Sequence, residues 1–103
     1  MPAPIEIAAN TYKTVAASQT AQTLGNGAVG DVLDRLVIVP ATTSPGNVII
    51  IDGATSITVF TGGATSVADL TPIYLEFGIK SVAGPWKVTT GAAVSVIASG
   101  RFT

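Results

Sequence analysis

The chain of 103 residues contains no histidine and no cysteine, and only 11% of its residues are charged. Histidine and cysteine are the side chains that most often transfer protons near neutral pH, attack carbonyl carbons or bind transition metals. Their absence, together with the low content of charged residues, disfavours catalysis and metal binding. We therefore expect a protein that is not an enzyme, needs no cofactor and binds no metal.

Charged residues of either sign are scarce. The chain has 5 Lys and Arg and 6 Asp and Glu, which gives a formal net charge of -1. A protein that binds nucleic acid clusters its basic side chains to neutralise phosphates. Here the basic residues are scattered singly: Lys13, Arg35, Lys80, Lys87 and Arg101. We therefore expect no nucleic-acid partner. With 48% hydrophobic residues, the chain has little electrostatic protection against self-association, which predicts a homo-oligomer, a dimer or a trimer.

Long hydrophobic runs are also missing. A membrane-spanning helix needs about 20 consecutive apolar residues, whereas the longest runs, 36–39 and 48–51, end at Pro40 and Asp52. No membrane partner is expected. The N-terminus has neither a positively charged start nor a long apolar stretch, so we expect no secretory signal and a cytoplasmic location at synthesis.

What the chain does contain is alternation of apolar and polar residues, which predicts β-strands. The clearest case is Pro72–Lys80, where every second residue from Ile73 to Ile79 is apolar. Glycine, proline and asparagine clusters separate the apolar segments and leave no room for a helix of ordinary length. The other predicted strands are Tyr12–Ala16, Ala21–Leu24, Val32–Val39, Val48–Ile51, Ser56–Phe60, Trp86–Thr89 and Ala93–Ala98.

About eight short strands at this spacing predict an all-β fold, an antiparallel β-sandwich that is jelly-roll-like. The predicted sandwich domain covers residues 11–103. Val32–Val39 and Val48–Ile51 are apolar on both faces, which is typical of central strands covered on each side. Either a neighbouring subunit or long loops of the same chain would provide the second cover.

Residues 1–10 differ from the rest and predict an extended N-terminal arm. One interpretation is a frayed terminus. The other is that Ile5 and Ile7, which alternate with Glu6, add a strand to an exposed sheet edge of an adjoining molecule. Ile5 and Ile7 are therefore candidate interface residues.

Three patterns invite a chemical interpretation. Gly25–Gly30 matches the G-x-G-x-x-G spacing of dinucleotide sites, but the chain that follows is β-branched rather than helical, so a glycine-rich loop is expected. The acids do not occur at calcium-loop spacing; Asp31 and Asp34 are expected to be solvated or paired with Arg35, and Asp52 to be a turn residue. Ser81 has no histidine to activate it, and Lys80 points to the opposite side of a strand.

A carbohydrate-binding surface would need exposed aromatic side chains, and the candidates are Tyr12, Tyr74 and Trp86. Trp86 follows Gly84-Pro85 at a strand start. This position is more typical of a core residue or an interface anchor than of a sugar platform.

Several segments resemble small virion proteins encoded near the head genes of tailed bacteriophages and prophages. In the first half these are residues 12–21, Leu24-Gly25 and Gly30-Asp31. In the second half they are Gly78-Ile79-Lys80-Ser81, 84–91 and Val94-Ser95-Val96-Ile97-Ala98-Ser99-Gly100. The resemblance extends from Tyr12 to Phe102, and its motifs contain no catalytic residue.

The resemblance implies a β-sandwich of the capsid decoration, cement or head-spike type, which binds the outside of the head shell and stabilises it as an oligomer. Its partners would be the major capsid protein or another virion protein, and its location the capsid surface after synthesis in the host cytoplasm. A tail, neck or fibre module and a carbohydrate-binding module are the alternatives. Tyr74, Trp86 and Phe102 are the candidate interface anchors, with core packing as the alternative for each.

Overall fold

The computed structural model describes residues 11–25 and 29–102, so the predicted arm with Ile5 and Ile7 lies outside the described residues. Eight β-strands and no helix occur in the described part, and every strand pair is antiparallel. The strands are β1 Thr11–Val15, β2 Gln22–Thr23, β3 Val32–Pro40, β4 Val48–Asp52, β5 Thr55–Phe60, β6 Ile73–Lys80, β7 Trp86–Thr90 and β8 Val94–Arg101.

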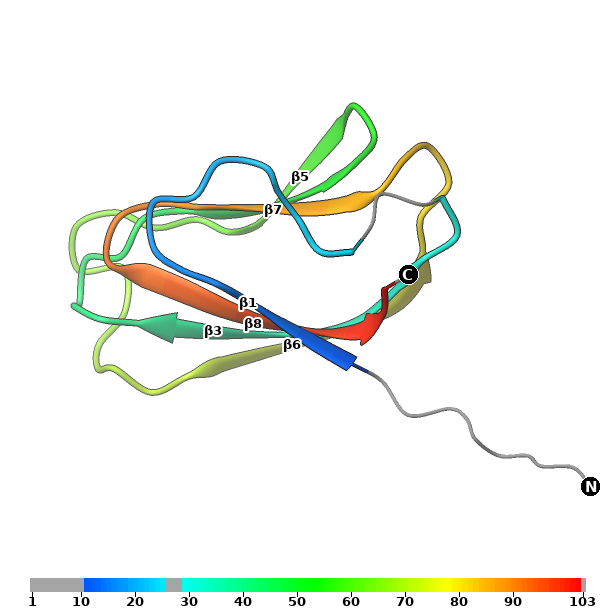
Figure 1. Ribbon diagram of the computed structural model, residues 1–103. Helices are drawn as coiled ribbons and strands as arrows, with labels where there is room; N and C mark the ends of the chain where they lie inside the picture. Colours follow the sequence, from blue (N-terminus) through cyan, green and yellow to red (C-terminus); the bar gives the residue numbers. More distant parts are fainter. Residues whose placement is uncertain (1–10, 26–28, 103) are drawn as a thin grey trace, which may run out of the picture.

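The strands form two four-stranded sheets that lie face to face (Figure 1). Sheet A has the order β1-β8-β3-β6, and sheet B has the order β2-β7-β4-β5. The first strand pairs with the last, the second with the seventh, the third with the sixth and the fourth with the fifth. This nested pairing is that of one long antiparallel ribbon rolled over itself, which is the jelly-roll topology. The predicted all-β, jelly-roll-like sandwich is confirmed.

The core lies between the sheets and is built by the inward positions of the alternating strands. On sheet A, Leu36 and Ile38 of β3 are fully buried; on sheet B, Val48 and Ile50 of β4 are buried in the same way. Such burial contributes roughly 1.5–3 kcal/mol for each large aliphatic side chain. The remaining buried hydrophobic residues are Val15, Leu24, Leu33, Trp86, Val88, Val94, Val96 and Ala98.

β3 and β4 are internal strands, as their two-sided apolarity predicts. Val37 and Val39 point to the outer side of sheet A, and Ile49 and Ile51 to the outer side of sheet B, because they alternate with core residues. All four keep intermediate exposure, so the described residues do not fully cover them.

No helix of the described residues is long and apolar enough to cross a membrane.

Candidate interaction surfaces

The residues singled out for chemistry have structural roles. No group of three or more His, Cys, Asp or Glu side chains placed to hold a metal ion occurs among the described residues, and no pocket opens between them. Ser81 is buried and its Oγ accepts a hydrogen bond from the backbone N–H of Gly30 at 2.8 Å. Strand β3, rather than a helix, follows Gly30, so the helix that the dinucleotide motif requires is not there.

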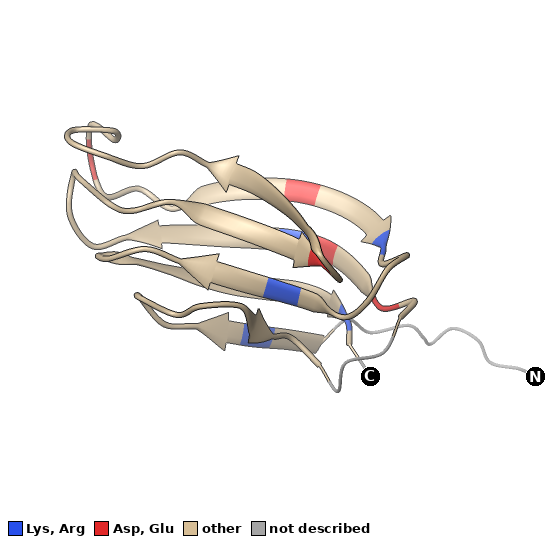
Figure 2. Cartoon of the chain, turned by 90° about the horizontal axis from the view of Figure 1, so that it is seen from above, with Lys and Arg blue, Asp and Glu red and all other residues tan. Residues whose placement is uncertain are grey.

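Charge is dispersed over the molecule. Figure 2 shows the basic and acidic residues spread over several strands and loops, with no large cluster of one sign. Arg35 of β3 and Glu76 of β6 form an ion pair at 3.0 Å, with the Arg35 side chain about half exposed and the Glu76 side chain largely exposed. A surface of this kind is suited to apolar contact, because few charges would have to be desolvated.

The first candidate surface is the outer face of sheet A. The strand register places its residues in rows that run across the strands. One row is Thr14, Ile97, Val37 and Tyr74, and the next row is Tyr12, Ser99, Arg35 and Glu76. Ser95 and Val39 form a third row, and Arg101, Val32 and Lys80 lie at the opposite end. We call this set the outer face of sheet A.

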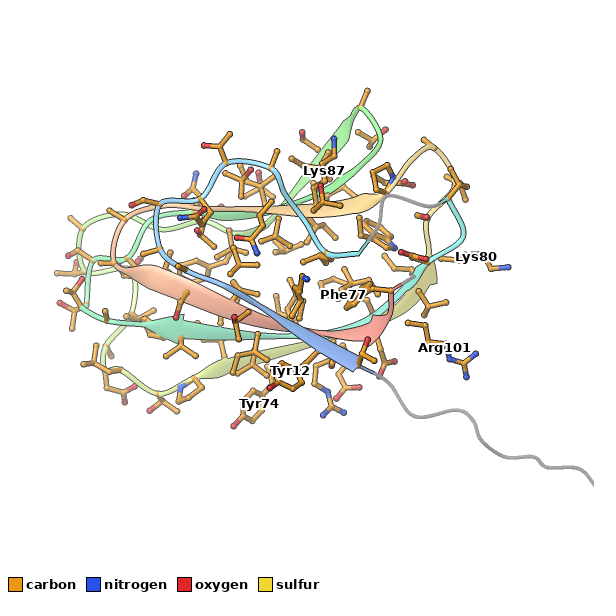
Figure 3. The ribbon with its side chains drawn as sticks, viewed as in Figure 1. Tyr12, Tyr74, Phe77, Lys80, Lys87 and Arg101 are labelled. Atoms are coloured by element: carbon orange, nitrogen blue, oxygen red, sulfur yellow. The ribbon has the colours of Figure 1, made fainter. Side chains whose placement is uncertain are left out.

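The outer face of sheet A exposes large apolar and aromatic side chains. Tyr12 and Tyr74 project from the outer side of the sheet, away from Phe77, which points between the sheets (Figure 3). Both tyrosines are more than half exposed, and Ile97 between them is 40% exposed. Ile97, Val37 and the two tyrosines therefore give this sheet face a partly exposed apolar centre.

The second candidate surface is one end of the sandwich, where three loops meet. The backbone N–H groups of Val82, Ala83 and Gly84 all donate hydrogen bonds to the carboxylate of Asp52, at 2.9, 3.2 and 3.1 Å. Gly53 lies so close to Ala83 that a Cβ on Gly53 would meet it at 2.9 Å. Asp52 therefore fixes the β6–β7 loop onto the β4–β5 turn.

The β2–β3 loop is fixed to the same end. The carbonyl oxygen of Asp31 accepts a hydrogen bond from the Ser81 N–H at 2.9 Å and another from the Trp86 Nε1–H at 3.0 Å. Together with the Gly30–Ser81 bond, these contacts tie residues 29–31 to residues 81–86. We call residues 29–31, 52–54 and 81–85 the clamped end.

The hydrogen bonds also set the ionisation of Asp52. The Val82 amide has the largest effect and lowers the pKa of Asp52 below its ordinary value of 3.8; the amides of Ala83 and Gly84 add to this, while burial opposes it. The carboxylate is therefore charged at neutral pH and holds the loop by charge-assisted hydrogen bonds.

The clamped end presents apolar side chains to solvent. Val82 is 80% exposed and Val29 is 61% exposed; Ala83 in the β6–β7 loop and Ala54 in the β4–β5 turn are exposed too. Exposed valines are ordinary when single, but here they stand on loops that a hydrogen-bond network joins. The sequence pattern did not predict this surface, and it predicted Asp52 only as a turn residue. The sequence feature that could have indicated this surface is Val82, a β-branched apolar residue within the turn 81–85, which ends in Gly84-Pro85.

The predicted interface residues differ in how far the structure exposes them to solvent. Tyr74 is exposed on the outer face of sheet A, and its role as an interface anchor stays a prediction. Trp86 is only 3% exposed and packs in the core, in agreement with core packing, the alternative given for it; the side chain has almost no surface to offer to a partner. Phe102 is partly buried against the core. Ile5 and Ile7 lie outside the described residues.

No protein-family model matches the chain, and neither a curated protein nor a solved structure matches it. The resemblance to small virion proteins therefore stays a prediction.

Proposed function

We propose that this protein is a non-enzymatic structural component of a bacteriophage virion, a capsid decoration or cement protein that binds the outside of the head shell and stabilises it. The observation that carries the proposal is the clamped end, where Val29 and Val82 project from loops held by Asp52 and Ser81. The resemblance of residues 12–102 to small virion proteins supports the same role.

The clamped end is suited to shell binding because its loops are already ordered. Association costs free energy when side chains and loops must be immobilised, and preorganised loops avoid much of that cost. Binding to the assembled shell and not to free shell subunits then stabilises the shell by mass action. Repeated sites on a shell allow an oligomer to bind at several points, which raises the overall affinity without any strong single contact.

Co-sedimentation with mature, empty phage heads tests the proposal. We expect the wild-type protein to pellet with heads at micromolar concentration and the Val82→Asp variant to lose at least tenfold in affinity, because a carboxylate would be desolvated at the contact. Leu70→Asp is the matched control, since Leu70 is an exposed apolar residue in the β5–β6 loop, outside the clamped end. Absence of wild-type protein from the pellet would show that the decoration proposal is wrong.

The same experiment addresses the tail, neck or fibre alternative. Purified tails replace heads in a parallel series, and the decoration role predicts retention on heads alone. Retention on tails alone would favour the alternative.

Carbohydrate binding remains a second candidate because Tyr12 and Tyr74 are both exposed on the outer face of sheet A. Aromatic rings stack on the apolar faces of sugars, and exposed aromatic residues on a flat sheet provide such contacts. Wild-type protein and a Tyr12→Ser/Tyr74→Ser variant applied to a glycan array test this candidate. Signal from the wild type that the variant lacks would support it.

A further inference from the structure

The β4–β5 turn begins with two residues that are able to react with each other. Asp52 is the only aspartate of the chain that glycine follows, since the others precede valine, arginine or leucine. Glycine has no Cβ, so the backbone nitrogen of Gly53 is less shielded than that of any other residue type. We propose that Asp52 is a site of spontaneous isomerisation to isoaspartate, which the closed clamped end keeps unreactive. This modification lies beyond the proposed function.

The reaction uses groups that the turn itself contains, and water. The backbone nitrogen of Gly53 attacks Cγ of Asp52, an N–Cγ bond forms and the Cγ–OH bond breaks, so that one water molecule leaves with the amide proton. Proximity favours such an intramolecular attack. Water then adds to one carbonyl carbon of the five-membered succinimide. Addition at Cγ restores aspartate, whereas addition at the main-chain carbonyl carbon gives isoaspartate, and no electrons are exchanged.

The strand conformation of Asp52 keeps the two reacting atoms apart. Asp52 is the last residue of β4, and it pairs with Thr55 of β5 and with Trp86 of β7. An extended residue has a ψ of about +135°, which turns the next backbone nitrogen away from the residue's own side chain. Ring closure needs that nitrogen and Cβ on the same side of the Cα–C bond. Asp52 must therefore leave the strand conformation before it reacts.

The clamped end holds the side chain of Asp52 in place. Its carboxylate accepts hydrogen bonds from the backbone amides of Val82, Ala83 and Gly84 at 2.9, 3.2 and 3.1 Å, and Asp52 is only 7% exposed. Gly53 is enclosed as well, because a Cβ on Gly84 would meet the Cα of Gly53 at 2.7 Å. A succinimide would remove the charged acceptor of all three hydrogen bonds, so the closed clamped end opposes its formation.

The same contacts keep the carboxyl group in its less reactive form. Succinimide formation proceeds from the protonated carboxyl group, because a carboxylate has no hydroxyl group to lose. The Val82 amide, together with those of Ala83 and Gly84, lowers the pKa of Asp52 below its ordinary value of 3.8, against the opposing effect of burial. Once the clamped end opens, these hydrogen bonds are gone, and mildly acidic solution favours the reaction.

Isomerisation opens the clamped end permanently. In isoaspartate the main chain runs through Cβ and Cγ, which adds one methylene group to the turn and leaves the free carboxylate on Cα. The three amides of the β6–β7 loop lose their acceptor, and the exposed Val82 loses its fixed position. A shell contact made by Val82 is then weaker, because the loop has to be ordered again on binding. Only this loss of shell binding rests on the proposed function.

Peptide mapping of the purified full chain tests the proposal. The protein is incubated in mildly acidic buffer, either folded or unfolded in guanidinium chloride, and isoaspartate is located by electron-transfer fragmentation. We expect isomerisation at Asp52 to be at least about tenfold slower in the folded chain, because only the open state reacts. Asn26-Gly27, outside the described residues, lies in another tryptic peptide and is counted separately. Equal rates in both states, or no isoaspartate at Asp52 in the unfolded chain, would overturn the proposal.

Two glycine variants test whether the clamped end provides the protection. In Gly84→Ala the new Cβ pushes the β6–β7 loop away from Gly53, so we expect isomerisation in the folded state to accelerate at least about fivefold. Gly91→Ala is the matched control, because its Cβ would meet the Cα of Gly46 at the same 2.7 Å, at the opposite end of the sandwich. Circular dichroism checks that both variants fold. Equal acceleration in both would show that global unfolding controls the reaction and would contradict protection by the clamped end.

The isoaspartate form, separated by anion exchange, tests the consequence of the modification. We expect a lower unfolding midpoint than that of the unmodified protein, and weaker co-sedimentation with heads. An unchanged midpoint would show that isomerisation leaves the clamped end closed, contrary to the proposal. If neither form pellets with heads, the shell role is wrong, and the mapping and the unfolding midpoint still decide whether Asp52 isomerises as proposed.

Discussion

At the residue scale, Asp52 is the side chain that contributes most to holding the clamped end together. One carboxylate accepts hydrogen bonds from three successive backbone amides of the β6–β7 loop. Removal of its charge leaves these amides with a weaker acceptor in a mostly buried position. The position of the exposed Val82 depends on this carboxylate, because the backbone N–H of Val82 is one of the three hydrogen-bond donors.

We predict that Asp52→Asn destabilises the fold by about 1–2 kcal/mol at neutral pH, since hydrogen bonds to a charged acceptor are stronger than those to an amide. The folded-state pKa of Asp52 lies below the ordinary value of 3.8. Its contribution is therefore present at pH above that value and is lost as the pH falls through the folded-state pKa. Urea denaturation from pH 7 to pH 2.5 should show the difference between wild type and variant shrinking in acid.

Asp69→Asn is the control for this experiment. The pKa of Asp69 is also lowered, by hydrogen bonds from the side chain and backbone of Thr71, but its loop is exposed and separate from the clamped end. We expect a much smaller change in its unfolding midpoint. An equal loss in both variants would show that Asp52 has no special role.

Trp86 supports the clamped end from below. It fills the core and donates to the carbonyl oxygen of Asp31. We predict that Trp86→Phe costs about 1–3 kcal/mol and Trp86→Ala about 3–5 kcal/mol, because the alanine leaves a cavity. Chemical denaturation followed by circular dichroism measures both. A loss below about 1 kcal/mol in Trp86→Ala would contradict the core placement.

At the element scale, strand β8 organises sheet A because it lies between β1 and β3. Where the register of β3 against β8 shifts between Leu33 and Arg35, the strand opposite carries Gly100. A Cβ on Gly100 would collide with the backbone oxygen of Val32 and approach Phe102. Glycine is therefore required by the close approach of the two backbones.

We predict that Gly100→Ala destabilises the protein by about 1–3 kcal/mol, the usual cost of forcing an extra group into a packed region. Ser95→Ala, on the outward side of the same strand, should change the stability by less than about 0.5 kcal/mol. Thermal unfolding of both variants provides the comparison. Equal midpoints would show that β3 and β8 do not approach as closely as described.

The strand bounds show how well the local sequence pattern predicted where each strand begins and ends. The alternation at 72–80 and the β-branched runs at 32–39 and 48–51 predicted β6, β3 and β4 to within about one residue. The prediction at 93–98 ended too early: β8 continues to Arg101 because β1 and β3 pair with it on both sides and override the low strand propensity of Ser99 and Gly100. The strand at 21–24 shrinks to Gln22–Thr23, because Ala21 adopts a positive φ of 48°.

At the scale of the whole molecule, the nested topology joins the two ends of the described chain. The hydroxyl of Thr11 donates to the carbonyl oxygen of Gly100, across 89 residues. Such pairs form only after a large loss of chain entropy, so proteins dominated by them fold slowly. We predict refolding in milliseconds to seconds, measured by stopped-flow fluorescence of the single tryptophan. Complete refolding within microseconds would contradict the prediction.

The sequence by itself determined where most strands lie and which of their side chains face the core, because alternation depends on neighbours a few residues apart. It also indicated the scarcity of reactive groups and the two-sided apolarity of β3 and β4. Only the tertiary structure decided that Trp86 is core, that Asp52 holds the β6–β7 loop, and that Ile97, Val37 and Tyr74 share one row. These relations join residues far apart in the chain, and long-range pairing and burial over the whole sandwich select them.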